Sequence, residues 1–243
     1  VDALHLIAFG ILFIIIMSYI AEKYKRSDYL IFSLGAAFFF FMFLLTEKIN
    51  WANFLPIPFA AYLYQGTGSY FPLFPWAGYV ISGALLGSYL AKNPLSFSTK
   101  QFSYKLFLFG VISLVVCYSI HSFEDSLYGE KTFWTDNTAL IFYRLGIILM
   151  LNSLMSFISL RIKCIPDIIS KIGKNTLLVY AVHVIILYGS AWIPGFGMFY
   201  SKTLNIPLSI LAALLLIVFM FWFVSLFERM KNYRRRKIVA VEI

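Results

Sequence analysis

Charged residues are scarce in this chain of 243 residues. Asp, Glu, Lys and Arg together make up 13% of it, whereas a water-soluble domain carries about 25%. Hydrophobic residues account for 61%, and the mean hydropathy is +0.82. This balance excludes an ordinary soluble domain.

Cysteine and histidine are rarer still. Cys117 lies inside an apolar run and Cys164 in a basic loop, a placement that does not predict a disulfide. With only three histidines and no metal-ligand spacing, no metal site is predicted. The chain also lacks the G-x-G-x-x-G, P-loop, H-E-x-x-H and G-x-S-x-G motifs, which excludes the common soluble nucleotide-binding and hydrolase classes.

Long apolar runs are what the chain does have. Runs of about 18–25 residues are the length that crosses a bilayer as a helix. We therefore predict an all-α, polytopic transmembrane helix bundle that forms a single domain over residues 1–243. Turn signals separate about seven spans, which we place at residues 3–21, 29–46, 75–91, 104–121, 138–160, 173–192 and 206–227.

Positive charge differs strongly between alternate loops. Sixteen of the 20 lysines and arginines follow the first, third, fifth and last spans, whereas the other loops hold Lys48, Lys131 and Lys202. The positive-inside rule makes the richer side cytoplasmic. Val1 is therefore expected outside and Ile243 inside an integral plasma (inner) membrane. The net charge of +9 then predicts contact with anionic lipids and not with nucleic acid.

Arg144 is a cation inside the fifth span, about six residues from its external end. An arginine at the centre of a membrane helix costs about 2.5–3.5 kcal/mol on insertion scales, and less near the interface. Its side chain either snorkels to the external headgroups or points inward to bind an anion or a carboxylate. Asn152, on the same helix, either forms a hydrogen bond to a neighbouring helix or borders the same cavity as Arg144.

His183 lies about ten residues inside the apolar stretch 173–192, with Tyr180 three positions earlier. At about 1.5 Å of rise per residue, the imidazole is expected about 15 Å deep, near the middle of the bilayer. Ionisable groups there usually face a bundle interior, a water-filled cavity or a ligand path. His183 is therefore either a neutral imidazole bonded to a neighbouring helix or a residue in direct contact with substrate.

Small residues recur in the third span. Gly83 and Gly87 form a G-x-x-x-G pair, and Gly78 and Ser82 form a similar pair of small residues just before it. Both pairs predict close packing against another helix.

Two strings of residues resemble the heparan-α-glucosaminide N-acetyltransferase-like family of integral-membrane acyltransferases. The first is Ser-Tyr-Phe-Pro-Leu-Phe-Pro-Trp-Ala-Gly-Tyr at 69–79, running into Gly-Ala-Leu-Leu-Gly at 83–87. The second is Ile-Gly-Lys-Asn-Thr-Leu-Leu-Val-Tyr-Ala-Val-His at 172–183. Residues 143–146 and 1–5 are similar to family segments too, so the resemblance covers essentially the whole chain. One departure is Ser69, since the family pattern often has an acid before the tyrosine.

The resemblance implies acyl transfer across the membrane. Acyl-CoA, in particular acetyl-CoA, would donate from the cytoplasm, and a sugar amine or hydroxyl of a saccharide or glycolipid outside would accept. On the acceptor side, the residues expected to bind substrate are Arg144, Asn152, Tyr70, Trp76 and Tyr180.

The second string would serve the donor and the transfer itself. Lys174 and Asn175, at the cytoplasmic start of the sixth span, would meet the phosphates of acyl-CoA with help from a helix N-terminus. His183 would be an auxiliary catalytic group, acting through a hydrogen bond or a proton relay.

The family's N-terminal helices and its catalytic histidine region would precede Val1. The chain is thus expected to be an N-terminally truncated fragment of a protein with about ten spans, and the main catalytic residue falls on no position of it. Two other function classes compete: a transporter or flippase for a lipid-linked or anionic sugar, and a non-catalytic membrane partner. The acceptor and the oligomeric state, a homo-oligomer included, stay open.

Overall fold

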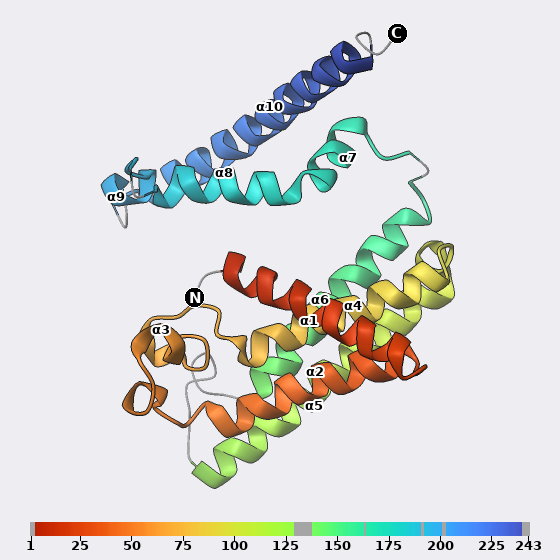
Figure 1. Cartoon of the computed structure of the whole chain (residues 1–243), viewed down its shortest axis with the longest axis vertical. Coiled ribbons are helices and arrows are strands. Elements are labelled where there is room, and N and C mark those ends of the chain that lie inside the picture. The colour runs from red at the N-terminus through yellow and green to blue at the C-terminus, as the bar shows by residue number, and fades with distance from the viewer. Residues whose placement is uncertain (1–2, 129–137, 163, 191, 201–202, 240–243) are drawn as a thin grey trace. The chain divides into compact units, whose positions relative to one another are not determined.

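The computed structural model describes residues 3–128, 138–162, 164–190, 192–200 and 203–239. Within these ranges the chain is helical, with one isolated β-bridge between Gly189 and Pro194. It forms two compact units, residues 1–162 and 163–243 (Figure 1). The helices are α1 (Ala3–Lys23), α2 (Asp28–Thr46), α3 (Ile57–Ala60), α4 (Leu73–Lys92), α5 (Lys100–Tyr128), α6 (Ala139–Ser159), α7 (Asp167–Lys174), α8 (Thr176–Tyr188), α9 (Phe196–Tyr200) and α10 (Ile206–Val239), and the short 3₁₀ turns are η1 (Trp51–Asn53), η2 (Gln65–Thr67) and η3 (Ser96–Ser98).

The predicted class, a bundle of membrane-spanning helices, is confirmed. In the part of the chain that the structure describes, six helices are long and apolar enough to cross a bilayer: α1, α2, α4, α5, α6 and α10. Each overlaps a predicted span, with ends that differ by a few residues. The largest differences are in α5, which extends from Lys100 to Tyr128, and in α10, which extends to Val239. The chain is therefore a multi-pass membrane protein.

The predicted span 173–192 is not one straight helix. The helix breaks at Asn175, where α7 and α8 meet at a bend of 77°. The Asn175 side chain donates to the Lys171 carbonyl at 2.8 Å, a local bond by which asparagine competes with helix continuation. Since α8 has only 13 residues, it rises about 20 Å. His183 therefore lies about 10 Å from the start of its own helix, not 15 Å.

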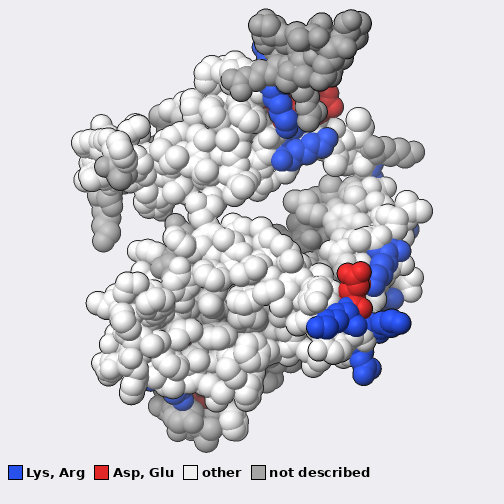
Figure 2. Space-filling view, viewed as in Figure 1, with Lys and Arg blue, Asp and Glu red and all other residues white. Residues whose placement is uncertain are grey.

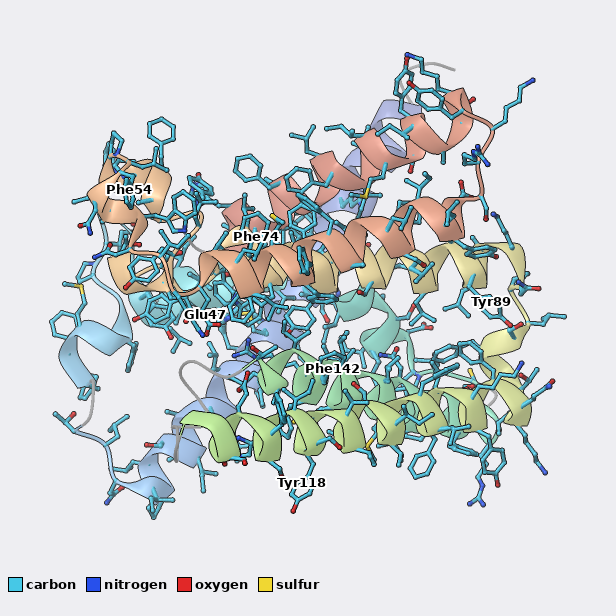
Figure 3. All side chains as sticks on the ribbon, turned by 90° about the horizontal axis from the view of Figure 1, so that it is seen from below. Glu47, Phe54, Phe74, Tyr89, Tyr118 and Phe142 are labelled. Carbon is cyan, nitrogen blue, oxygen red and sulfur yellow. The ribbon has the colours of Figure 1, made fainter. Side chains whose placement is uncertain are left out.

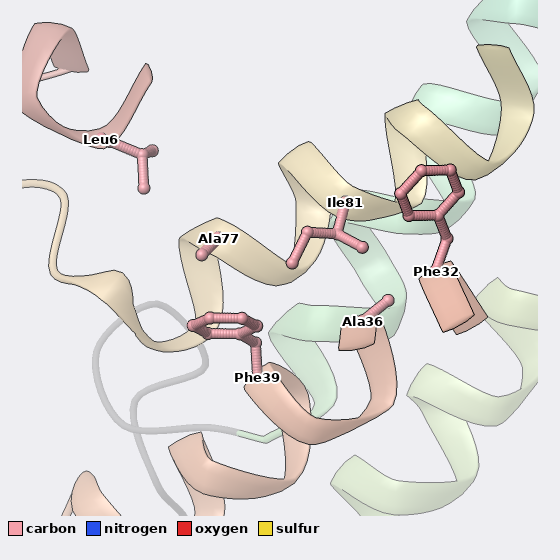
Figure 4. Packing of buried hydrophobic residues seen from close by; sticks show 6 residues of the cluster. All are labelled: Leu6, Phe32, Ala36, Phe39, Ala77 and Ile81. Carbon is pink, nitrogen blue, oxygen red and sulfur yellow. The ribbon is translucent and has the colours of Figure 1, made fainter. Parts of the chain in front are cut away.

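The α1–α2–α4 group forms the core of the first unit (Figure 4). Glycines at the crossings permit this packing: a Cβ on Gly10 would lie 2.7 Å from Val80, and one on Gly78 would lie 2.6 Å from Phe40. At both positions the missing side chain of glycine leaves room for a side chain of the neighbouring helix, and this close packing favours helix association in lipid, where burial of apolar surface contributes little. The buried cluster consists of Leu6, Phe32, Ala36, Phe39, Ala77 and Ile81.

The α5–α6 pair is held by small residues and hydroxyl groups. A Cβ on Gly110 would lie 3.1 Å from the Gly146 carbonyl oxygen, so the two backbones touch at this point. Nearer the start of α5 and the end of α6, the hydroxyls of Ser103 and Ser156 lie 2.6 Å apart, and Ser153 donates to the Ser103 carbonyl at 2.8 Å. Hydrogen bonds between membrane helices average about 0.6 kcal/mol each. Together they fix the register of this pair.

Within the first unit, no helix packs against Gly83 and Gly87, so the close packing predicted for this pair is not found there. Both glycines are exposed, and a Cβ added to either would meet no atom within 4 Å. The helix turns these positions away from α2, whereas Gly78, on the packed face, does fit its prediction. A G-x-x-x-G spacing shows that two small residues share a face but not which face is packed.

The outer surface of the first unit is apolar. Large side chains such as Ile15 and Leu34 are about 60% exposed, as expected of residues that face lipid. Figure 2 shows basic side chains gathered at one end of this unit, where α1 meets α2. Of the cations in the loop count, Lys131, Lys163 and Lys202 lie outside the described residues, as do the side chains of 232–239.

Candidate functional site

Residues 69–79 lead into α4 through an interrupted first turn. Phe74 has the extended dihedrals φ −98° and ψ 125°, so the regular helix begins at Pro75. Proline is tolerated there because the first turn needs no N–H donor. Pro72 and Pro75 are fully buried. This packing holds Trp76 in the first regular turn and Tyr79 one turn later.

Arg144 of α6 lies on the face of the Trp76 ring, with 4.7 Å between the guanidinium carbon and the ring centroid. The Trp76 ring also makes edge contacts with Phe71 at 4.9 Å and with Tyr79 at 5.7 Å. A desolvated cation–π pair contributes about 2 kcal/mol. We call Trp76, Tyr79 and Arg144 the Arg144 cluster.

The cluster contains buried polar groups that are unpaired or incompletely paired. The buried Trp76 Nε1 has no hydrogen-bond partner among the described residues. The buried Tyr79 hydroxyl makes no hydrogen bond of regular geometry there, but the Arg144 guanidinium is close enough for a side-chain interaction with it. The hydroxyl of Ser69, earlier in the same segment, is also buried and has no hydrogen-bond partner among the described residues. An unpaired buried polar group costs about 1–3 kcal/mol. A bound ligand or an ordered water can pair with such groups.

The charge of Arg144 is available to a ligand. In the described part of the chain, no carboxylate forms an ion pair with it. A guanidinium, an indole N–H and a phenol together can bind an anion or a polar oxygen of a sugar.

The structure brings two of the five predicted acceptor residues together. Trp76 and Arg144 are in contact, whereas Tyr70 is 81% exposed and lies outside the cluster. Asn152 lies about 12 Å further along α6 and donates to the Ile148 carbonyl of its own helix at 2.9 Å. Tyr79 was missed, although its position three residues after Trp76 places both on one helix face.

His183 of the second unit is half-buried and has a defined tautomer. Its Nδ1 lies 3.0 Å from the Val179 carbonyl oxygen. A carbonyl only accepts, so Nδ1 carries the proton and Nε2 has a free lone pair when the ring is neutral. The Tyr180 ring packs edge-on against the imidazole at 5.3 Å. This leaves Nε2 able to accept a hydrogen bond or a proton.

The residues predicted to hold the donor lie at the α7–α8 bend. Lys174 ends α7 with an exposed side chain. Asn175 donates to the Glu228 carboxylate of α10 at 3.0 Å. Glu228 in turn lies 3.7 Å from Lys231. Sequence reasoning missed Glu228, because nothing in the spacing of two segments so far apart indicates the contact.

Comparison with known proteins supports one family. Residues 3–123 match the family model of the catalytic region of heparan-alpha-glucosaminide N-acetyltransferase. No curated protein and no solved structure matches the chain. The matched region is about half of the chain and includes the segment that carries Trp76 and Tyr79, whereas Arg144 and His183 lie beyond it. The chain belongs to the heparan-α-glucosaminide N-acetyltransferase-like family.

Proposed function

We propose that this protein is a membrane-embedded acyltransferase. It moves an acyl group, most simply acetyl, from cytoplasmic acyl-CoA to a sugar amine or hydroxyl on the external side. The family match and the multi-pass bundle support a membrane acetyltransferase in general. We place the protein in the plasma (inner) membrane, and the loop charges support an orientation with residue 1 outside and residue 243 inside.

The observation that carries the proposal is the Arg144 cluster. In acyl transfer, the acceptor nitrogen or oxygen attacks the thioester carbon, the C–S bond breaks, and CoA leaves as a thiol with the proton that the acceptor loses. The reaction needs a correctly held acceptor, a proton path and donors for the oxyanion. The cluster would hold an anionic or polar group of the acceptor with Arg144, Trp76 Nε1 and the Tyr79 hydroxyl.

For residues of the second unit, the proposed roles rest on the family resemblance and on the contacts within that unit. The free Nε2 of His183 is suited to relay a proton, in addition to the main catalytic residue. Lys174 would contact a phosphate of acyl-CoA. For Asn175 to do the same, phosphate would have to replace the Glu228 carboxylate as its partner.

The test is the release of CoA thiol by the intact protein in proteoliposomes with acetyl-CoA and sugar amines. Arg144→Gln should raise the KM for the acceptor, and Arg144→Lys should retain part of the affinity. His183→Ala should lower kcat. The control is Arg161→Gln, because Arg161 is an exposed cation just beyond α6. Normal transfer and normal acceptor affinity in both Arg144→Gln and His183→Ala would contradict these roles.

One observation favours a second candidate, a transporter or flippase for a lipid-linked or anionic sugar. The 77° break between α7 and α8 is the kind of discontinuity that transporters use to bind substrate. The same proteoliposomes separate the two functions. Movement of sugar without release of CoA would favour transport, whereas stoichiometric CoA release supports the acyltransferase.

A further inference from the structure

An apolar groove runs between α4 and the α5–α6 pair in the first unit. Its volume is about 780 Å³, within the range of about 300–1,000 Å³ that is typical of ligand sites. Figure 3 shows side chains of both groups facing this space, with Tyr118 of α5 on the opposite, outer side. The lining includes Leu85, Leu86, Phe109, Ile112, Val116 and Leu149.

Aromatic contacts bound the groove at two points. Tyr89 of α4 stacks on Phe102 of α5, with 5.7 Å between ring centroids and 5° between planes. Toward the other end, the Trp76–Arg144 contact joins α4 to α6. Between these two contacts, helix α4 and the α5–α6 pair leave the apolar space unfilled.

The walls of the groove offer a ligand few hydrogen-bond donors. Apart from Lys105, its polar side chains are those of two tyrosines, Tyr29 and Tyr89, and two serines. The serines are already engaged, because Ser82 donates to the Gly78 carbonyl at 2.8 Å and Ser113 to the Phe142 carbonyl at 2.7 Å. An amide-bearing arm, such as the pantetheine of CoA, would bury its amides here without partners, and that is unfavourable. A hydrocarbon chain has no such cost.

The length of the groove matches one leaflet of a bilayer. Along α5 the lining extends from Phe102 to Val116, and the part between Lys105 and Val116 rises about 16 Å. The hydrocarbon core of a membrane is about 30 Å thick. A chain that enters at Lys105 would therefore end near the midplane.

Lys105 is the single charged residue of the lining, and it stands at the end that carries Lys92 and Lys100. Lys92 is engaged with Asp28 at 2.7 Å. Lys105 is exposed and forms no ion pair with the described residues. The charge of Lys105 is thus complementary to an anionic headgroup at the mouth of an apolar groove.

We propose that the groove holds one acyl chain of an anionic phospholipid from the leaflet on the basic side, with Lys105 at the headgroup phosphate. This lipid is separate from donor and acceptor. It fills the space between the α1–α2–α4 group and the α5–α6 pair, and so supports the packing that brings Arg144 onto Trp76.

The test is photo-crosslinking in nanodiscs with phosphatidylglycerol that carries a diazirine in its acyl chain. Labelling is assigned to single residues. Leu85, Ile112 and Val116, which line the groove, should be labelled more strongly than exposed residues outside it, such as Val115. Val116→Trp fills the groove and should remove most of this labelling, whereas Val115→Trp on the outer surface should not. Ile112→Trp repeats the test if Val116→Trp folds poorly.

Charge recognition is tested by competition with unlabelled phosphatidylglycerol or phosphatidylcholine. Lys105→Gln should weaken the preference for the anionic lipid about fivefold. Lys105→Arg, which keeps the positive charge, should retain the preference. The control Lys100→Gln should leave it unchanged. Equal labelling of groove and outer positions would show ordinary surrounding lipid and overturn the proposal. An unchanged lipid preference in Lys105→Gln would overturn the headgroup contact.

Discussion

At the scale of single residues, buried polar atoms that are unpaired or incompletely paired mark the candidate site. The Tyr79 hydroxyl and the Trp76 N–H lie beside a guanidinium that has no carboxylate partner among the described residues. These groups cost stability in the empty protein. They are expected to contribute to binding instead, so stability and function should respond in opposite directions to their removal.

Tyr79→Phe tests this separation. The ring contacts with Phe40 and Trp76 remain, and the buried hydroxyl, whose nearby polar group is the Arg144 guanidinium, is removed. The free energy of unfolding should stay the same or rise by about 1 kcal/mol, while the KM for the acceptor rises. Thermal unfolding and transfer kinetics measure the two effects, and Tyr118→Phe on the outer surface is the control. A less stable variant with normal kinetics would assign the hydroxyl a structural role.

Gly189 lies at a position where the backbone conformation and the close contacts require glycine. Its dihedrals, φ 82° and ψ −169°, are those of glycine, and an added Cβ would lie 2.5 Å from the Gly195 nitrogen. Gly189→Ala should therefore destabilise the protein by about 1–3 kcal/mol. Gly173→Ala is the matched control, because a Cβ there meets no atom within 4 Å. Equal thermal stability of the two variants would contradict the strained turn.

At the scale of helices, contact between backbones decides which glycines matter. Gly110 and Gly146 touch across α5 and α6, whereas Gly83 and Gly87 of α4 face open space. From the sequence, Gly83 and Gly87 were the predicted packing pair because they form a G-x-x-x-G motif, whereas Gly110 and Gly146 lie far apart in the chain. Packing in lipid depends on shape, and hydrophobicity cannot identify the packed face because lipid is as apolar as the neighbouring helix.

Gly110→Ala should loosen the α5–α6 pair. The new methyl group would meet Met150 at 2.7 Å and the Gly146 carbonyl at 3.1 Å, and overpacking of this kind costs about 1–3 kcal/mol. Gly83→Ala should be neutral or stabilising, because alanine favours a helix by about 1 kcal/mol over glycine. Thermal unfolding in detergent compares them. Should Gly83→Ala prove the more damaging, this account of α4 would fail.

The break between α7 and α8 also belongs to this scale. The apolar run in 173–192 predicts a helix, and most of it is one. The Asn175 amide bonds to the Lys171 carbonyl and to Glu228 of α10, which ends one helix and anchors the turn. The first bond is local and is typical of asparagine. The second needs a residue far along the chain, so the sequence could not predict it.

At the scale of the whole molecule, alternating loop charge predicts the orientation in the membrane. A membrane-impermeant maleimide should label the exposed Cys164 only after the membrane is opened, since its loop is on the basic side. A Gln65→Cys variant, in the loop before α4, should react in intact cells. Cys117 is buried and should stay unlabelled.

The reverse pattern, with Cys164 reactive from outside, would overturn the proposed topology and the cytoplasmic entry of acyl-CoA. It would leave the Arg144 cluster intact, because that cluster lies within one unit. A Cys164→Ser variant removes the native signal and shows that the label reports this loop.

The site could be predicted only in part. Arg144 attracts notice because a charge inside a span is costly, and Trp76 because it stands in the family-like segment 69–79. Their contact could not be predicted, since they come from different helices and no local pattern connects them. Tyr79 could have been predicted from the sequence, because its spacing from Trp76 places both residues on the same helix face.

The sequence alone determined that this is a multi-pass bundle, and it located six of the crossing helices. It could do so because a bilayer demands long apolar runs, and these are visible residue by residue. Tertiary structure decided which glycines touch, where the helix at Asn175 breaks, and that Arg144 lies on Trp76. It also decided that an apolar groove remains between α4 and the α5–α6 pair. These features depend on shape and contact between distant segments, and periodicity along one helix carries no information about its partner.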